Sequence, residues 1–433
     1  MNLYLNIEIL NREFHSKLLL GMESASKGMN VYLGRLKPYL MRDFFAPGII
    51  LDKSITPTPN RLKEMEYCKK KNFFYTSLDE EVGLVKNDYL KLRYSNKSLE
   101  LVDKVFCWGK WDFDFLCKKF PRYKKKFSLT GNPRIDFWRK DFNFFHDDKD
   151  LKYKNYILFS LNFSYLVSRS KFEKMLNFYL ESKYFDRGLS INKVKKVKKD
   201  SLRMYGEFCK LIIALAKKTD LQIIVRPHPT DSENNYSFLK KFKNVKVIKK
   251  GNISEWIHHA KLVVHSGCTG GLEASVRGCP TISYSPFNST HGHKIADKYS
   301  IKTKKLGKCI NVIQQIIKKN YKLKKVDLKK IKHRSYNIMT NKPSYKIVVN
   351  EFVKLMRLNK ITYNNNDLLL NLKFKLRDFR SKLLKLEYGN IKFRTFDKFE
   401  TNKTFNALKK INPKFNNLKI VFIKKDIIQI KLS

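Results

Sequence analysis

The sequence lacks paired cysteines, long apolar runs and an apolar leader. Its seven cysteines are odd in number and show no CxxC spacing, so they argue against a disulfide framework and are typical of a reducing compartment. No apolar run approaches the length needed to span a bilayer, and Glu8, Arg12 and Glu13 come too early for a signal peptide. We therefore expect a cytoplasmic protein, or one bound peripherally to the inner face of a membrane.

A metal-binding signature is also missing. The nine histidines include His258-His259, predicted on a helix, and His291-Gly292-His293, predicted in a loop. Zinc at these positions is the less favoured alternative. We expect neither a metal nor another cofactor.

Acidic residues are scarce: 39 Asp and Glu face 90 Lys and Arg, for a formal net charge of +51. Such a charge is typical of nucleic-acid-binding proteins. The excess is mostly lysine spread along the whole chain, as an AT-rich genome produces, and no zinc-finger, ribonucleoprotein or basic-zipper pattern accompanies it. A basic surface facing anionic lipid or an anionic glycan is the preferred interpretation, and we do not expect nucleic acid as a partner.

What the sequence does contain is enough apolar material for two domains. Of its 433 residues, 42% are hydrophobic and 13% aromatic, which supports two cores and an appendage. Apolar runs alternate with helical patterns, which predicts an α/β fold with parallel sheets. We expect an N-terminal Rossmann-like domain over 1–137, a linker over 138–154, a C-terminal Rossmann-like domain over 155–360 and a basic C-terminal extension over 361–433.

Periodicity places the individual elements. Strands are predicted at 3–10, 31–33, 49–51, 73–76, 102–107, 127–130, 156–161, 221–225, 262–265 and 281–284. Helices are predicted at 11–28, 60–70, 205–218, 255–260, 294–299, 310–318 and 345–356. Residues 194–199 are interpreted as a solvated basic run, and residues 418–430 as β-like.

The stretch from 221 to 286 carries a candidate binding site. After the strand at 262–265, a turn rich in glycine and hydroxyl residues opens a helix: Ser266, Gly267, Thr269, Gly270 and Gly271. Ligands bind beyond the carboxyl ends of parallel strands, and a helix N-terminus offers N–H groups and positive potential to a phosphate. The turn therefore predicts a nucleotide-phosphate site, with a tight helix-packing corner as the alternative.

Two further residues belong to this predicted site. His228 follows the strand at 221–225, where Pro227 and Pro229 end the strand, and a protonated His228 would face the same phosphate. Glu273, one turn into the helix, would accept hydrogen bonds from ribose hydroxyls. A purely structural role for His228 is the alternative.

Seven short motifs resemble, in order and spacing, those of bacterial surface carbohydrate biosynthesis proteins. They are NIEILNREF, APGIILDKS, LDEEVG, VFCWG, SLTGNPRID, RPHP and HSGCTGGLEA…GCP, over about residues 3–350. The resemblance implies a glycosyltransferase of the GT-B type, with two Rossmann-like domains facing a cleft. Three motifs are more distantly similar to those of bacterial sialyltransferases and Kdo transferases, which use CMP-sugars.

The resemblance assigns an acidic motif, a His-Pro motif and a hydroxyl pair to this chain. They fall on Asp79, Glu80, Glu81 and Gly83, on His228 and Pro229, and on Cys268 and Thr269. Two positions depart from the family pattern. Val82 separates the acids from the glycine, and Cys268 stands where a serine is usual, which leaves Thr269 and Ser266 to supply hydroxyls.

The implied function is glycosyl transfer in the synthesis of capsule, lipopolysaccharide O-antigen or a similar surface polysaccharide. A nonulosonic acid or Kdo-like sugar would pass from a CMP-sugar to a glycan or lipid-linked acceptor, with inversion and without metal. Glu80 or Glu81 would be the base, since paired carboxylates raise one pKa; a solvated acidic loop is the alternative. His228 would donate to the leaving phosphate and Arg226 would add positive charge.

The remaining expectations concern the acceptor and the rival functions. Arg12, Glu13 and Lys53 would line the acceptor side, unless Arg12-Glu13 is only helix-start charge. A CDP-alcohol polyol-phosphate transferase of the teichoic-acid type is a second enzyme reading, and a nucleic-acid-binding protein is the non-enzymatic one. A nucleotide-sugar 2-epimerase is disfavoured, because its Gly-Thr-Arg-Pro-Glu after the first strand is absent.

Overall fold

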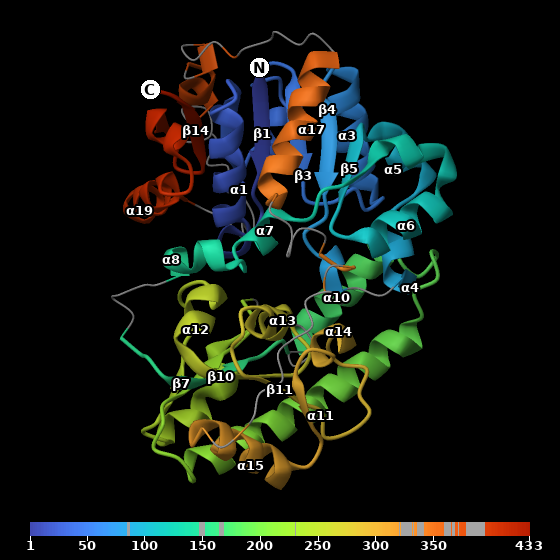
Figure 1. Ribbon diagram of the computed structural model, residues 1–433. Coiled ribbons are helices and arrows are strands. Elements are labelled where there is room, and N and C mark those ends of the chain that lie inside the picture. Colours follow the sequence, from blue (N-terminus) through green and yellow to red (C-terminus); the bar gives the residue numbers. More distant parts are fainter. Residues whose placement is uncertain are drawn as a thin grey trace. The chain divides into compact units, whose positions relative to one another are not determined.

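The chain folds into two compact units in the computed structural model (Figure 1). The described residues are 1–84, 87–146, 152–163, 169–229, 231–319, 321, 331, 333–335, 342–358, 365, 369–370, 372–377 and 395–433. The first unit holds Met1–Gly83, Asn87–Phe137 and the described part of Lys329–Ser433, and the second holds Leu84 and the described part of Trp138–Leu328.

An eight-stranded sheet forms the centre of the first unit, in the order β13-β14-β2-β1-β3-β4-β5-β6. Its strands are β1 (Asn2–Asn6), β2 (Asn30–Gly34), β3 (Gly48–Asp52), β4 (Phe74–Leu78), β5 (Lys104–Cys107), β6 (Phe127–Leu129), β13 (Leu418–Lys424) and β14 (Ile427–Leu432). The first six pair in parallel, and the β13–β14 hairpin joins β2 in antiparallel fashion.

Helices cover this sheet. They are α1 (Leu10–Ala25), α2 (Lys37–Leu40), α3 (Pro59–Lys70), α4 (Asn87–Leu90), α5 (Asn96–Leu101), α6 (Lys110–Lys119), α7 (Pro133–Asp136), α17 (Ser344–Leu358) and α19 (Lys398–Lys409), with 3-10 helices η1 (Val82–Leu84), η2 (Lys91–Arg93), η3 (Pro121–Lys126) and η7 (Pro413–Asn417). Helix α17 packs beside α1 (Figure 1). Strand β1 is buried along its whole length, which explains why the apolar residues Leu3, Tyr4 and Leu5 follow one another without polar alternation.

A six-stranded parallel sheet forms the second unit, in the order β12-β11-β10-β7-β8-β9. Its strands are β7 (Tyr156–Ser160), β8 (Ile223–Arg226), β9 (Val245–Val247), β10 (Ala260–His265), β11 (Thr281–Tyr284) and β12 (Ile301–Thr303). Its helices are α8 (Asn143–His146), α10 (Arg169–Glu181), α11 (Ile191–Ala216), α12 (Ile253–His259), α13 (Thr269–Val276), α14 (Lys294–Asp297) and α15 (Leu306–Ile317), with η4 (Lys140–Phe142) and η5 (Glu233–Lys241). Apolar side chains of α11 and α15 pack in one core cluster, and those of α12 and α13 in another.

Each sheet contains one point where the chain reverses its direction of winding. In the first sheet β2 lies on one side of β1 and β3 to β6 lie on the other, so this switch point falls between β1 and β3. In the second sheet it falls between β7 and β10. Loops leave such neighbouring strands toward opposite faces, and the crevice at their carboxyl ends is where doubly wound sheets bind ligands. The two switch points therefore define where to look for function.

The predicted α/β class with two Rossmann-like units is confirmed, with corrections to several elements. The strand predicted at 3–10 is too long, because β1 ends at Asn6 and α1 begins at Leu10. The basic run at 194–199 is not a free segment but part of α11, whose inner face buries Val194, Met204 and Phe208. Strands β9 and β12 were not predicted.

The C-terminal part of the chain adds to the first unit. Residues 155–360 were expected to form one domain and 361–433 an extension, yet α17 packs on α1 and the β13–β14 hairpin completes the first sheet. Residues 164–168 and 378–394, within stretches for which we made predictions, lie outside the described residues. Among the described helices, none combines the length and apolar character needed to cross a membrane.

Candidate functional site

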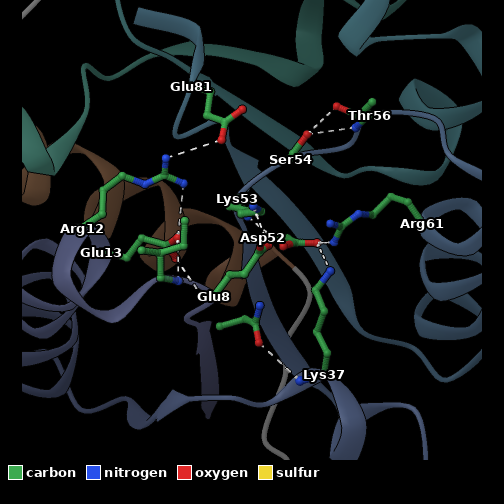
Figure 2. Close-up of polar contacts among 12 residues, drawn as sticks. Glu8, Arg12, Glu13, Lys37, Asp52, Lys53, Ser54, Thr56, Arg61 and Glu81 are labelled. Atoms are coloured by element: carbon green, nitrogen blue, oxygen red, sulfur yellow. Dashed lines mark hydrogen bonds and ion pairs between the residues drawn. The ribbon is translucent and has the colours of Figure 1, made fainter. Parts of the chain in front are cut away.

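The switch point of the first sheet is lined by charged side chains from the ends of β1 and β3 (Figure 2). Arg12, on α1, lies with Nη1 3.5 Å from Glu81 Oε1 and Nη2 3.6 Å from Glu13 Oε1. Lys53, which follows β3, lies with Nζ 2.5 Å from Glu8 Oε2. The residues predicted to line an acceptor, Arg12, Glu13 and Lys53, are thus brought to one place beside the acidic motif.

Glu13 serves the start of helix α1. The helix has no side-chain cap at Ile9, and the Glu13 carboxylate instead accepts hydrogen bonds from the backbone N–H groups of Glu8 and Ile9, each at 3.2 Å. Lys17 Nζ donates to Glu13 Oε2 at 2.8 Å. These contacts support the helix-start interpretation for Glu13. Arg12 keeps Nε and Nη2 buried, with no hydrogen-bond partner for either atom in the part of the chain that the structure describes.

The three acids of the predicted catalytic motif have different environments. Asp79 is buried and accepts from Arg93 Nε at 2.5 Å and from Arg93 Nη2 at 2.9 Å. Glu81 has a side chain 47% exposed, and the charges of Arg93 and Arg12 lower its pKa against the effect of burial. Fixed cations therefore favour the ionised form of Glu81, and Asp79 is engaged in a buried ion pair with Arg93.

Glu80 is the carboxylate with an unengaged oxygen. It is 5% exposed, and its Oε2 has no hydrogen-bond partner among the described residues. Burial raises the pKa of Glu80 even though Lys17 opposes this shift. The other charged groups around it are Glu13, Arg134 and Arg12. A buried carboxyl with raised pKa and a free oxygen is the environment of a proton-transfer group.

Packing explains the glycine of this motif. A Cβ at Gly83 would lie 2.2 Å from the Trp108 ring, so the acidic loop lies directly on the indole. Trp108 Nε1 also donates to the Asp79 carbonyl oxygen at 2.5 Å. Trp108 is buried, as expected for a core residue.

Sequence reasoning missed a buried charge cluster at the end of β3 (Figure 2). Asp52 is fully buried and accepts from Lys37 Nζ at 2.9 Å, from Arg61 Nη1 and from the Tyr75 hydroxyl. Its signal was an aspartate directly after the apolar strand. The cluster is internally paired, so it supports the loop after β3 rather than offering a free group.

The glycine-rich turn of the second unit lies at the β7–β10 switch point. Ser266 Oγ donates to Asn162 Oδ1 at 2.6 Å, and Gly267 has a φ of +85°, which favours glycine. Cys268 is the N-cap of α13, with its thiol accepting from Gly271 N at 3.4 Å. Thr269, half-buried, is the first helical residue. The predicted turn residues therefore do gather at a helix start.

Two of these glycines are also required by packing. A Cβ at Gly271 would lie 2.4 Å from the His265 ring, and one at Gly270 would lie 2.6 Å from Ser160 Oγ. The packing-corner alternative thus accounts for part of the glycine pattern. Burial raises the pKa of the Cys268 thiol, so it stays protonated near neutral pH and acts as a cap.

The two residues predicted from the RPHP motif, Arg226 and His228, have different environments. Arg226 is buried, and its guanidinium donates to the carbonyls of Ile248, Lys250 and Gly251 at 2.9, 2.5 and 2.7 Å. Burial lowers the pKa of Arg226 to about 10. These bonds hold the β9–α12 connection and favour a structural role over direct charge. His228 is half-buried at the carboxyl end of the same sheet, two strands from the turn.

Glu273, which was predicted to accept hydrogen bonds from a ribose, forms an ion pair within the protein. It is 2% exposed and pairs with Arg277 Nη1 at 3.3 Å, and Arg277 in turn donates to the Ser254 carbonyl at 2.7 Å. The ion pair lies along α13, and the hydrogen bond from Arg277 to Ser254 joins it to α12. A ribose contact by Glu273 stays a prediction that these bonds do not favour.

Sequence reasoning missed two residues that contact the glycine-rich turn, Asn162 and His291. His291 Nε2 lies 2.9 Å from Asn162 Oδ1, and Asn162 also contacts Ser266. The only sequence signal for His291 was the His-Gly-His loop, considered for zinc. Within the described part of the chain, no group of three or more His, Cys, Asp or Glu side chains is placed to hold a metal ion.

Comparison with known proteins shows the fold. No protein-family model matches the chain, and neither does a curated protein. Among solved structures, it is similar to UDP-GlcNAc 2-epimerase of Methanocaldococcus jannaschii in complex with UDP-GlcNAc and UDP, with 14% identity, TM-score 0.50 and coverage of 82% of this chain and 100% of that one.

Two further structures are similar to the chain. S. aureus MnaA with UDP shows 12% identity and a TM-score of 0.49 over 84% of this chain and 99% of that one. The wall teichoic acid polymerase TagF shows 12% identity and a TM-score of 0.45 over 84% and 90%. The two largely parallel sheets, together with the likeness to the M. jannaschii structure at a TM-score of 0.50, show a two-domain α/β fold of the GT-B type.

Proposed function

We propose that this chain is a nucleotide-sugar-dependent glycosyltransferase of cell-surface polysaccharide synthesis, acting in the cytoplasm or at the inner membrane face. The observation that carries the proposal is Glu80, a 5% exposed carboxylate at the strand ends of the first sheet, whose Oε2 accepts no hydrogen bond from any described residue. Its raised pKa makes it a stronger base than a solvated carboxylate once it is ionised. The donor we propose is a CMP-linked nonulosonic acid or Kdo-like sugar.

In the proposed reaction the acceptor oxygen attacks the anomeric carbon while its proton passes to Glu80. The bond between that carbon and the donor phosphate oxygen breaks, and the phosphate leaves with the electron pair. Backbone N–H groups at the start of α13 would stabilise this charge, and His228 would donate to the same phosphate. The proposed displacement inverts the anomeric centre and uses no metal.

The position of the glycine turn supports nucleotide binding in the second unit. It lies at the β7–β10 switch point, and the strand order of this sheet is the one that binds dinucleotides at that point in other proteins. The proposed acceptor is a glycan or a lipid-linked glycan, bound near Arg12 and Lys53.

A UDP-GlcNAc 2-epimerase is the second candidate. It is favoured by the fold likeness to the M. jannaschii epimerase, which extends over 82% of this chain. An epimerase also needs a buried carboxylate for proton transfer, so Glu80 suits both chemistries. The Glu8–Glu13 segment, which lacks the Gly-Thr-Arg-Pro-Glu expected there, speaks against it.

The donor decides between these candidates. Thermal shifts of the purified chain are measured with CMP, CDP, UDP and GDP, followed by incubation with UDP-GlcNAc and chromatography for the 2-epimer. We expect stabilisation by CMP and no epimer. Stabilisation by UDP with epimer formation would replace the transferase by the epimerase, CDP alone would indicate the polyol-phosphate reaction, and no shift with any nucleotide would contradict both proposals.

A further inference from the structure

Residues 289–293 form a loop that clasps the glycine turn of the second unit. The His293 N–H donates to the Gly267 carbonyl oxygen at 2.7 Å. Gly292 passes so close to the turn that a Cβ there would lie 2.1 Å from the Ser266 carbonyl oxygen. The turn is thus shaped by a second loop as well as by its own glycines.

The His291 ring joins three parts of the second unit. It is 3% exposed, and its Nε2 lies 2.9 Å from Asn162 Oδ1 and 3.3 Å from Ser266 Oγ. Its Nδ1 lies 2.7 Å from Ser201 Oγ on α11. The Phe163 ring stacks on it with a centroid distance of 4.9 Å. One imidazole therefore links the end of β7, the turn after β10 and helix α11.

The clasping loop is itself anchored to α11. Asp200 Oδ2 accepts from both the backbone N–H and the hydroxyl of Thr290, each at 2.7 Å. The Asp200–Thr290 and Ser201–His291 contacts are adjacent, because Asp200 precedes Ser201 on α11 and Thr290 precedes His291 in the loop. The loop therefore has a fixed position from which His291 constrains the turn.

We propose that His291 is a positioning residue that holds residues 266–268 in the shape that receives a nucleotide phosphate. The inference rests on the proposed function, because it assigns His291 to the phosphate site of that function. Backbone donors recognise a phosphate only when they are held within a few tenths of an ångström of the productive geometry. The Asn162–His291–Ser266 contacts supply that constraint from outside the turn.

The test compares nucleotide with nucleoside. Dissociation constants for CMP and cytidine, and for UDP and uridine, are measured by ligand-observed NMR and competition on the full chain. We expect His291→Leu to weaken nucleotide binding by about tenfold or more while changing nucleoside binding less than about twofold. His291→Gln, whose amide reaches the Nε2 position, is expected to restore most of the nucleotide affinity.

A second variant tests the clasp without removing the imidazole. Gly292→Ala places a Cβ against Ser266 and is expected to weaken nucleotide binding by about tenfold. Gly188→Ala is the matched control: Gly188 also has a positive φ, +93° against +72°, but a Cβ there meets nothing within 4 Å. We expect it to bind nucleotide as the unchanged chain does.

The outcomes separate this inference from the proposed function. Nucleotide binding that survives in both His291→Leu and Gly292→Ala overturns the positioning role and leaves the function standing. Equal loss of nucleotide and nucleoside assigns His291 a general structural role and also overturns it. An unchanged chain that binds neither nucleotide contradicts the proposed function, and the inference falls with it.

Discussion

At the scale of single residues, burial of Glu80 suits it to proton transfer and lowers the stability of the fold. Because burial raises the pKa of Glu80 in the folded state, the unfolded chain ionises at lower pH. The resulting loss of stability appears as pH rises through the folded pKa. We expect Glu80→Gln to lower the transfer rate by about 100-fold or more and to raise the free energy of unfolding near neutral pH by ~1 kcal/mol.

The prediction for Glu80 is checked by urea unfolding at two pH values, with Glu81→Gln as the control. Urea unfolding near neutral pH and below about pH 4, where both states are protonated, should show the gain for Glu80→Gln at the higher pH alone. Glu81→Gln removes an exposed carboxylate with lowered pKa and is expected to change stability by less than ~1 kcal/mol. A Glu80→Gln variant with full activity would exclude Glu80 as the base.

Asp79 has the opposite relation to stability. Its carboxylate neutralises Arg93, which is buried with it. Asp79→Asn replaces the close carboxylate by a neutral amide and leaves Arg93 only the longer ion pair with Glu81, at 3.6 Å, so we expect a loss of ~3 kcal/mol in the free energy of unfolding. Asp43→Asn, at an exposed ion pair with Lys71, is the control with little expected change. Equal stability of the two variants would contradict the structural role given to Asp79.

At the scale of elements, the C-terminal hairpin is a structural part of the first sheet. Ile430 on β14 is fully buried and lies against Gly21 of α1, where a Cβ would be 2.8 Å from its Cδ1. We expect Ile430→Ala to cost ~3 kcal/mol in the free energy of unfolding, through lost contacts and a cavity. The measurement is urea unfolding of the full chain.

Val421 on β13 provides the control within the same hairpin. It is 36% exposed, so Val421→Ala should cost less than ~1 kcal/mol. If both variants lose the same small amount, the hairpin does not contribute to the core. The hairpin also pairs the edge of β2, so that β13 is the outer strand of the sheet.

The predictability of each element follows from its local signal. Strand β11 was predicted to the residue, because Pro280 and Pro286 bound the short extended run Thr281–Tyr284. Strands β9 and β12 have three residues each, with a lysine in the middle, and give no such run. Helix α11 was recognised only in its second half, because lysines between Val194 and Ser201 obscure the buried face.

The same reasoning applies to the candidate site. The glycine turn and the acidic motif were predicted because their residues are contiguous in the chain. Contacts between distant residues were not: Asn162 and His291 lie 129 positions apart, and only the fold brings them together. The sequence also left open which of the three acids could act as the base. Asp79 is engaged by Arg93, and Arg93 belongs to no recognisable motif.

At the scale of the whole molecule, buried imidazoles make the second unit sensitive to acid. Burial lowers the pKa of His265 to about 4, against the opposing charge of Asp297, and the pKa of His291 to about 3. Both rings stay neutral in the folded state while the unfolded chain takes up protons below about pH 6.5. Stability is complete above that pH and falls as pH drops toward the folded values.

The net charge of +51 acts in the same direction, because protonation of carboxylates below about pH 5 adds to self-repulsion. Between about pH 6.5 and pH 5 the two imidazoles alone should cost ~2 kcal/mol each. Hydrogen exchange of peptides covering β10 reports this loss for the second unit alone. His291→Gln, which cannot titrate, should remove about half of the change. Exchange of β10 that stays constant over this range would show that neither ring is held neutral by the fold, and the hydrogen-bonded network around His291 would then have to accommodate an imidazolium.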